Sequence, residues 1–137
     1  MKIVSACLAG IECNYKGKAK PCQEVIELVK EGRAIPVCPE QLGGLKTPRP
    51  ASEIKNGRVV TKEGTDVTLQ FEKGAKEALK IALLANCKEA ILKARSPSCG
   101  SGRIYDGTFS GKLINGDGIF ASKLRKNKIK VFTEEEL

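Results

Sequence analysis

Short apolar stretches alternate with helical patterns along this chain of 137 residues. Strands that are separated by helices pair in parallel through right-handed crossovers. The alternation therefore predicts a single three-layer α/β domain over residues 1–137, with a mainly parallel sheet of about four strands. The four expected strands are Lys2–Leu8, Arg33–Cys38, Lys88–Ala94 and Lys128–Thr133.

The segments between these strands carry helix and turn signals. Apolar residues recur at helical spacing in three segments, 23–32, 65–87 and 116–127. Thr65 or Asp66 is expected to cap the long central helix, which Gly74 interrupts at a modest cost in helix propensity. The pair Asn56-Gly57 lies between two short β-like runs and predicts a small hairpin.

Three other segments have weaker signals. Pro36 has no N–H group, so its strand is expected near a sheet edge, or the proline near the strand end. Residues 39–53 contain proline and glycine throughout and predict a long irregular loop, a kind of segment that is often functional. Residues 134–137 are expected to be a frayed tail.

Composition limits where the protein acts and what it binds. No apolar run approaches the roughly 20 residues of a membrane-spanning helix, and the first residues are interpreted as a strand rather than a signal peptide, so the cytoplasm is the expected location. The net charge of +8 is compatible with an anionic partner such as nucleic acid. An aromatic content of only 4% argues against a base-stacking surface for nucleic acid and favours a solvated lysine-rich surface.

The chain has six cysteines and no histidine. In a chain of this size with a cytoplasmic composition, metal binding or catalysis is a better interpretation than disulfides. Cys7 lies at the end of the first predicted strand, Cys38 ends the second and Cys99 lies in the loop after the third, at the sheet edge where open α/β sheets form their sites. The alternative is that each cysteine is a small buried hydrophobic residue.

The side chains available as metal ligands limit which metal the site can bind. Three converging thiolates without histidine suit a soft metal centre, but no two cysteines have the close spacing of a structural zinc site. An iron–sulfur cluster is compatible with cysteines on separate loops, and three ligands to a four-iron cluster leave one iron open to a substrate. Cys13 and Cys22 are left open as further site residues, and Cys87 is expected on a packing face.

Four residues near these cysteines are candidates for the remaining chemistry. Glu40, two residues after Cys38, is the candidate acid–base group, with a loop salt bridge as the alternative. Arg49 stands between two prolines and is a candidate substrate-binding residue, with a structural ion pair as the alternative. Ser96 and Ser98 are candidates to hydrogen-bond a cluster sulfur or a substrate, with turn formation as the alternative.

Several long motifs occur in order along nearly the whole chain. They include "SACLAGIECNYKG", "VCPEQLGGLKTPRP" and "ARSPSCGSGRIYDGTFSG". With these motifs the sequence resembles the DUF523 family, which includes thiouracil desulfidase. The resemblance implies a Rossmann-like α/β domain that holds a [4Fe-4S] cluster and removes sulfur from a thiolated pyrimidine base, without net redox chemistry.

The resemblance also implies roles for individual residues. The cluster ligands implied are Cys7, Cys38 and Cys99. Glu40 and Ser96 are the best matches to the acidic residue and the serine that act in the family, and Ser98 is the alternative serine.

Three functions therefore compete. The leading hypothesis is a [4Fe-4S]-dependent enzyme that desulfurises a small thiolated base such as 2- or 4-thiouracil. The second is a non-enzymatic module that uses its cysteines to bind zinc or to sense redox state. The third, an RNA-associated protein, is favoured only by charge. The sequence does not indicate an oligomeric state.

Overall fold

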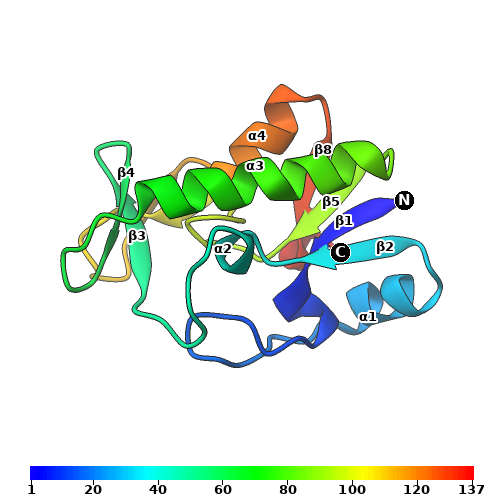
Figure 1. The fold of residues 1–137 in the computed structure, drawn as a ribbon, viewed down its shortest axis with the longest axis horizontal. Coiled ribbons are helices and arrows are strands. Elements are labelled where there is room, and N and C mark those ends of the chain that lie inside the picture. Colours follow the sequence, from blue (N-terminus) through cyan, green and yellow to red (C-terminus); the bar gives the residue numbers. More distant parts are fainter.

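The computed structural model describes all residues, 1–137, and contains the predicted four-stranded parallel sheet. Its strands are β1 (Lys2–Ser5), β2 (Ala34–Val37), β5 (Glu89–Leu92) and β8 (Lys130–Thr133). They lie in the order β2-β1-β5-β8 (Figure 1), so β1 pairs with β2 on one side and β5 on the other. Pro36 lies in β2, an edge strand, as predicted from its missing N–H group.

Helices cover both faces of this sheet, which confirms the predicted three layers (Figure 1). They are the 3₁₀ helix η1 (Ala6–Ala9) and α1 (Gln23–Lys30) on one face, and α3 (Thr68–Leu84) and α4 (Ile119–Lys126) on the other. Successive strand residues point to opposite layers, so Ile3 packs in the cluster of α3 and α4 while Val4 packs in the cluster of α1. No helix combines the length and apolar character needed to cross a bilayer.

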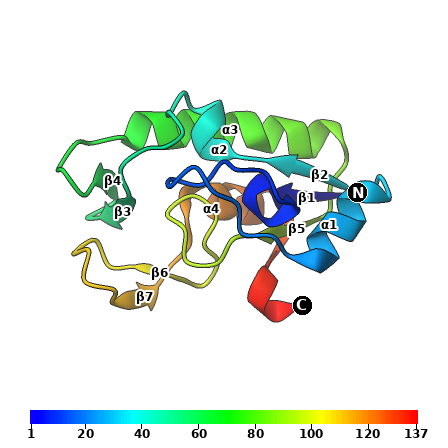
Figure 2. The same cartoon turned by 90° about the horizontal axis from the view of Figure 1, so that it is seen from below.

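Two antiparallel hairpins lie beyond the carboxyl ends of the sheet (Figure 2). They are β3 (Ser52–Lys55) with β4 (Arg58–Thr61), and β6 (Arg103–Tyr105) with β7 (Leu113–Asn115). The predicted turn at Asn56-Gly57 joins the first pair, with positive φ at both residues, as a tight hairpin turn requires. The sequence prediction missed the second hairpin, which contacts the first through β6 and β3.

The N-cap of α3 is Val67, which makes no side-chain cap bond, so the predicted cap at Thr65 or Asp66 was wrong by one or two residues. The Asp66 carboxylate accepts the N–H of Thr68 at 2.9 Å, although the helix begins two residues after Asp66. The Arg58 guanidinium also hydrogen-bonds Asp66, and the pKa of this exposed carboxyl is lowered to about 2, mainly by Arg58.

The expected frayed tail is ordered, so that prediction was wrong. Residues Glu134–Glu136 form the 3₁₀ helix η2, which begins with a capping box between Thr133 and Glu136. Glu134 also pairs with Lys93, 2.9 Å away, in the segment after β5. The tail is therefore tied to the end of a central strand.

Part of the expected irregular loop is helical, because α2 (Pro39–Leu42) begins directly after Cys38. Two glycines let α2 dock against the backbone of α3. A Cβ atom on Gly74 would lie only 1.7 Å from the Pro39 carbonyl oxygen, and one on Gly43 would lie 1.9 Å from the Gln70 carbonyl oxygen. Gly74, expected only to weaken the helix, thus permits the contact that positions α2.

Replacing Gly74 with alanine should destabilise the protein by about 1–3 kcal/mol through overpacking. This outcome opposes the roughly 1 kcal/mol that alanine normally gains over glycine in a helix. The free energy of unfolding in urea measures the difference. Lys73→Ala, on the exposed side of the same helix, is the control and should change stability by less than about 0.5 kcal/mol. A Gly74→Ala protein more stable than the wild type would contradict the contact.

Candidate metal and substrate site

A cavity of about 560 Å³ lies at the carboxyl ends of β1, β2 and β5. Four thiols line it: Cys7 in η1, Cys13 in the following loop, Cys38 after β2 and Cys99 in the loop after β5. The prediction that Cys7, Cys38 and Cys99 are neighbours in space is therefore confirmed. Cys13, which the sequence left open, joins them.

The start of α4 holds the loop that carries Cys99. The first N–H groups of a helix have no acceptor within the helix. In this protein Ile119 donates to the Pro97 carbonyl and Phe120 to the Ser98 carbonyl, both at 2.9 Å. The loop backbone thus serves as the helix cap, and this fixes the position of Cys99.

The four thiols differ in how readily they lose a proton. The neighbouring Cys13 side chain lowers the pKa of Cys38, and Arg49, 4.0 Å from the Cys38 sulfur, acts in the same direction. The proximity of Cys38, together with burial, raises the pKa of Cys13. Burial raises the pKa of Cys7 to about 11 and also raises the pKa of Cys99. In the metal-free protein, Cys38 is thus the thiol most disposed to be a thiolate.

Arg49 forms an ion pair with Glu40, so the structural ion pair that the sequence left as an alternative is present. Its Nε donates to Glu40 Oε1 at 2.9 Å, and only 6% of the Arg49 side chain is exposed. Its other nitrogens donate to the Cys13 carbonyl at 2.9 Å, to the Lys46 carbonyl at 3.1 Å and to Thr47 Oγ1 at 3.0 Å. Arg49 therefore links three segments of the cavity wall.

Glu40 presents one free oxygen at the cavity. Arg49 binds Oε1. Oε2 has no hydrogen-bond partner in the protein, and it is not among the polar atoms buried without a partner. Burial raises the pKa of the carboxyl, and the charge and hydrogen bond of Arg49 oppose this shift. The carboxylate is thus fixed in orientation and still able to bind a water molecule or a proton.

The two candidate serines have different surroundings. Ser96 lines the cavity, and its Oγ accepts the N–H groups of Ser98 at 3.1 Å and of Cys99 at 3.0 Å. These two bonds use the acceptor capacity of the hydroxyl and leave its hydrogen free to donate. Ser98 is buried behind the wall, is not among the residues that line the cavity, and has no hydrogen-bond partner for its Oγ.

The remaining cysteines lie away from the cavity. Cys87 is buried in the core cluster beneath α3 and α4, as predicted, and burial raises its pKa. Cys22 is half-buried at the start of α1. All six cysteines are free thiols.

Sequence reasoning missed several residues of the cavity wall. These are Tyr15, Glu53, Lys93, Tyr105 and Phe109. Tyr15, Tyr105 and Phe109 could have been predicted as site residues, because all three lie within the cysteine-bearing motifs of a chain with few aromatic residues. Nothing in the sequence pattern marks Glu53 and Lys93, because only tertiary packing brings them to the wall.

The thiols fit a metal cluster better than a single ion. No group of three or more histidine, cysteine, aspartate or glutamate side chains is arranged to hold one metal ion. A four-iron cluster binds each thiolate through a different iron, so its ligands are spread around it instead of meeting at one point. Three thiols on the wall of one cavity match this requirement, and the cavity volume is in the range of small-ligand pockets.

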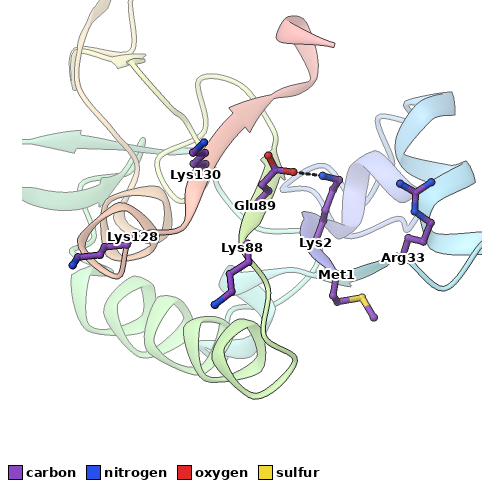
Figure 3. A pocket seen from close by; sticks show the side chains of 7 residues that line it. All are labelled: Met1, Lys2, Arg33, Lys88, Glu89, Lys128 and Lys130. Carbon is purple, nitrogen blue, oxygen red and sulfur yellow. Dashed lines mark hydrogen bonds and ion pairs between the residues drawn. The ribbon is translucent and has the colours of Figure 1, made fainter.

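A second hollow, of about 410 Å³, lies at the opposite, amino end of the sheet (Figure 3). Its lining is Met1, Lys2, Arg33, Lys88, Glu89, Lys128 and Lys130. Its only carboxylate, Glu89, is bound by Lys2. The hollow contributes to the positive charge of the surface, and it contains no thiol; its single sulfur is the thioether of Met1.

The fold and the cavity define an α/β protein that brings several thiols and one oriented carboxylate to a single small-ligand site. The family model described as 2-thiouracil desulfurase matches residues 3–136, and the chain belongs to that family.

Two relatives are similar over more than nine-tenths of their length. An uncharacterised protein of Bacillus subtilis (strain 168), YbbK, is 44% identical over 147 residues, covering 100% of this chain and 97% of YbbK. A solved structure described as the [4Fe-4S]-dependent thiouracil desulfidase TudS is 47% identical, with a TM-score of 0.93 over 98% of this chain and 91% of that chain.

The pKa differences predict a stepwise titration of the metal-free protein, followed by the ultraviolet absorbance of thiolates. Cys38 should lose its proton below the usual pH for a thiol, because its pKa is lowered, and Cys7 should do so near pH 11. Cys38→Ala should therefore remove the step at lowest pH. Cys87→Ala, outside the cavity, should leave that step in place. Persistence of the early step in Cys38→Ala would show that another thiol is responsible.

Proposed function

We propose that this protein removes sulfur from a thiolated pyrimidine base, such as 2- or 4-thiouracil, with a [4Fe-4S] cluster held by Cys7, Cys38 and Cys99. The observation that carries the proposal is the delivery of these three thiols to one cavity beside an oriented carboxylate. Membership of the 2-thiouracil desulfurase family and the close likeness to a [4Fe-4S]-dependent thiouracil desulfidase support it.

The three thiols have to lose their protons before they bind iron as thiolates, so loading the site releases protons. When bound, a cluster with three protein ligands supplies a Lewis-acidic iron open to the sulfur of a thiocarbonyl group. Cys13 remains as a fourth thiol of the wall, and its side chain beside Cys38 lowers the pKa of that ligand.

Glu40 handles protons in this proposal. The reaction adds water and releases sulfide. It converts a C=S group to C=O, and neither carbon nor sulfur changes its oxidation state. Oε2 of Glu40 accepts a proton from the attacking water, and the carboxyl can return that proton to the departing sulfur. Arg49 acts through Glu40, because its bond to Oε1 fixes the direction in which Oε2 points.

Ser96 orients the substrate. Its hydroxyl already accepts two N–H groups, so it acts as a hydrogen-bond donor towards the carbonyl oxygen, an unprotonated ring nitrogen or the thiocarbonyl sulfur of the base. Ser98 has no such role in the proposal, because it does not line the cavity. Arg49 contacts protein groups through all three of its nitrogens and is a positioning residue here.

The competing functions have less support. The thiols are not arranged around one ion, which disfavours the zinc module. Only the positive surface charge supports an RNA-associated protein. The free thiols agree with the reducing cytoplasm as the place of action. The cavity of about 560 Å³ agrees with a small-molecule partner.

Anaerobic reconstitution with iron and sulfide tests the ligands. Wild type should turn brown and bind about four irons, whereas Cys7→Ala, Cys38→Ala and Cys99→Ala should lose most of the visible absorbance. Cys87→Ala is the matched control and should keep it, because Cys87 packs in the core. A colourless wild type would remove the cluster from the proposal, and loss of iron in Cys87→Ala would overturn the ligand assignment.

Glu40→Gln should keep the fold and the cluster but slow sulfide release by about 10²- to 10⁴-fold, the usual range for losing a general acid or base. The change is nearly isosteric and leaves an oxygen for Arg49. Sulfide released from 2-thiouracil and 4-thiouracil is measured at matched iron content. Glu24→Gln, on α1, controls for loss of a carboxylate elsewhere. Equal rates in Glu40→Gln and wild type would exclude Glu40 as the proton carrier.

A further inference from the structure

The turn between β6 and β7 places Phe109 in the wall of the cavity with an unusual backbone conformation. Its φ is 56°, in the left-handed region that bulky side chains rarely adopt. Such strain persists only where the surroundings impose it, and it clusters at ligand-binding positions. The strained residue in this turn is also the one that brings an aromatic ring to the site.

A buried carboxylate imposes this conformation. Glu53 of β3 is only 9% exposed, and its Oε1 accepts the N–H groups of Gly107 at 3.0 Å and of Phe109 at 3.1 Å. Gly107 lies so close to β3 that a Cβ atom would be 2.7 Å from the Ile54 carbonyl oxygen. The turn is therefore fastened to the neighbouring hairpin at the residue before Thr108 and the residue after it.

Side chains within the turn restrain it further. Asp106 accepts the backbone N–H of Thr108 at 2.9 Å and its hydroxyl at 2.6 Å, and these bonds hold the pKa of the exposed Asp106 carboxyl below its usual value. The Thr108 hydroxyl also lies 2.6 Å from that of Ser110. Phe109 is thus flanked on both sides by fixed residues.

The aromatic residues of the chain are unevenly distributed. There are only six, four phenylalanines and two tyrosines. Phe71 and Phe120 are buried in the core. Both tyrosines, Tyr15 and Tyr105, line the same cavity as Phe109. Half of the aromatic residues therefore surround the thiols, where a planar ligand can stack.

We propose that Phe109 determines specificity for a planar heteroaromatic substrate by stacking on its ring, and that Glu53 is the positioning residue that holds Phe109 in place. This inference rests on the proposed function and adds the residue that recognises the ring. Phe109 has no polar group, so it contributes a face and no hydrogen bond. A thiocarbonyl compound that lacks an aromatic ring gains nothing from this contact.

Phe109→Leu tests the contact, because it keeps an apolar side chain and the same backbone constraint but removes the aromatic face. In the reconstituted holoenzyme, KM for 2-thiouracil and the Kd of uracil measured by calorimetry should both rise by about 5- to 150-fold, the range expected for one lost stacking contact. The kcat should change far less, because uniform binding is what is lost. Phe109→Tyr keeps the face and should stay within about twofold of wild type.

Two controls separate the possible failures. Phe132→Leu makes the same change on β8, outside the cavity, and should leave KM and Kd unchanged. Thioacetamide, which has no ring, should be converted equally by wild type and Phe109→Leu, at whatever rate it reacts. If wild type releases sulfide from 2-thiouracil but Phe109→Leu binds as tightly, the role of Phe109 is overturned while the proposed function stands. If iron-loaded wild type neither binds uracil nor releases sulfide, the proposed function itself fails.

Discussion

The site depends on the parallel pairing of β1 with both β2 and β5. Parallel strands end at the same edge of a sheet, and each of these three strands is followed within a few residues by a cysteine. Residues 7, 38 and 99 are far apart in the chain, so only this register brings their thiols to one cavity. A one-residue slip would exchange the two faces of a strand and move Ile3 and Val4 out of the core clusters in which they pack.

Arg49 is the second constraint, because it joins segments that the sheet does not hold. Its guanidinium bonds the carboxylate after β2 and the carbonyl of Cys13, and it lies 4.0 Å from the Cys38 sulfur. A buried charge without partners is costly, so the partners of Arg49 are as important to the fold as to the chemistry. The same cation favours ionisation of both Cys38 and Glu40. One residue thus sets both the shape and the charge of this side of the cavity.

The sequence predicted the features that depend on local patterns. Alternating strand and helix segments gave the three layers, Pro36 gave the edge strand, and strand-end cysteines gave the neighbouring thiols. It missed features that depend on tertiary partners. The η2 helix owes its order to the pairing of Glu134 with Lys93, and the β6–β7 hairpin has a long connection with no two-residue turn signal. Ser96 and Ser98 look equivalent in the motif, and only packing shows which one reaches the cavity.

The bond from the Ala94 N–H to Glu134, 2.8 Å long, has a consequence for biosynthesis. Glu134 is synthesised 35 residues after Cys99, yet it holds the segment that leads to Cys99. Cys7, Cys13 and Cys38 are all synthesised at least 61 residues before Cys99. The nascent chain therefore exposes three thiols without a finished cavity. The cavity wall is complete only when Glu134 has been synthesised and η2 has closed on the segment after β5.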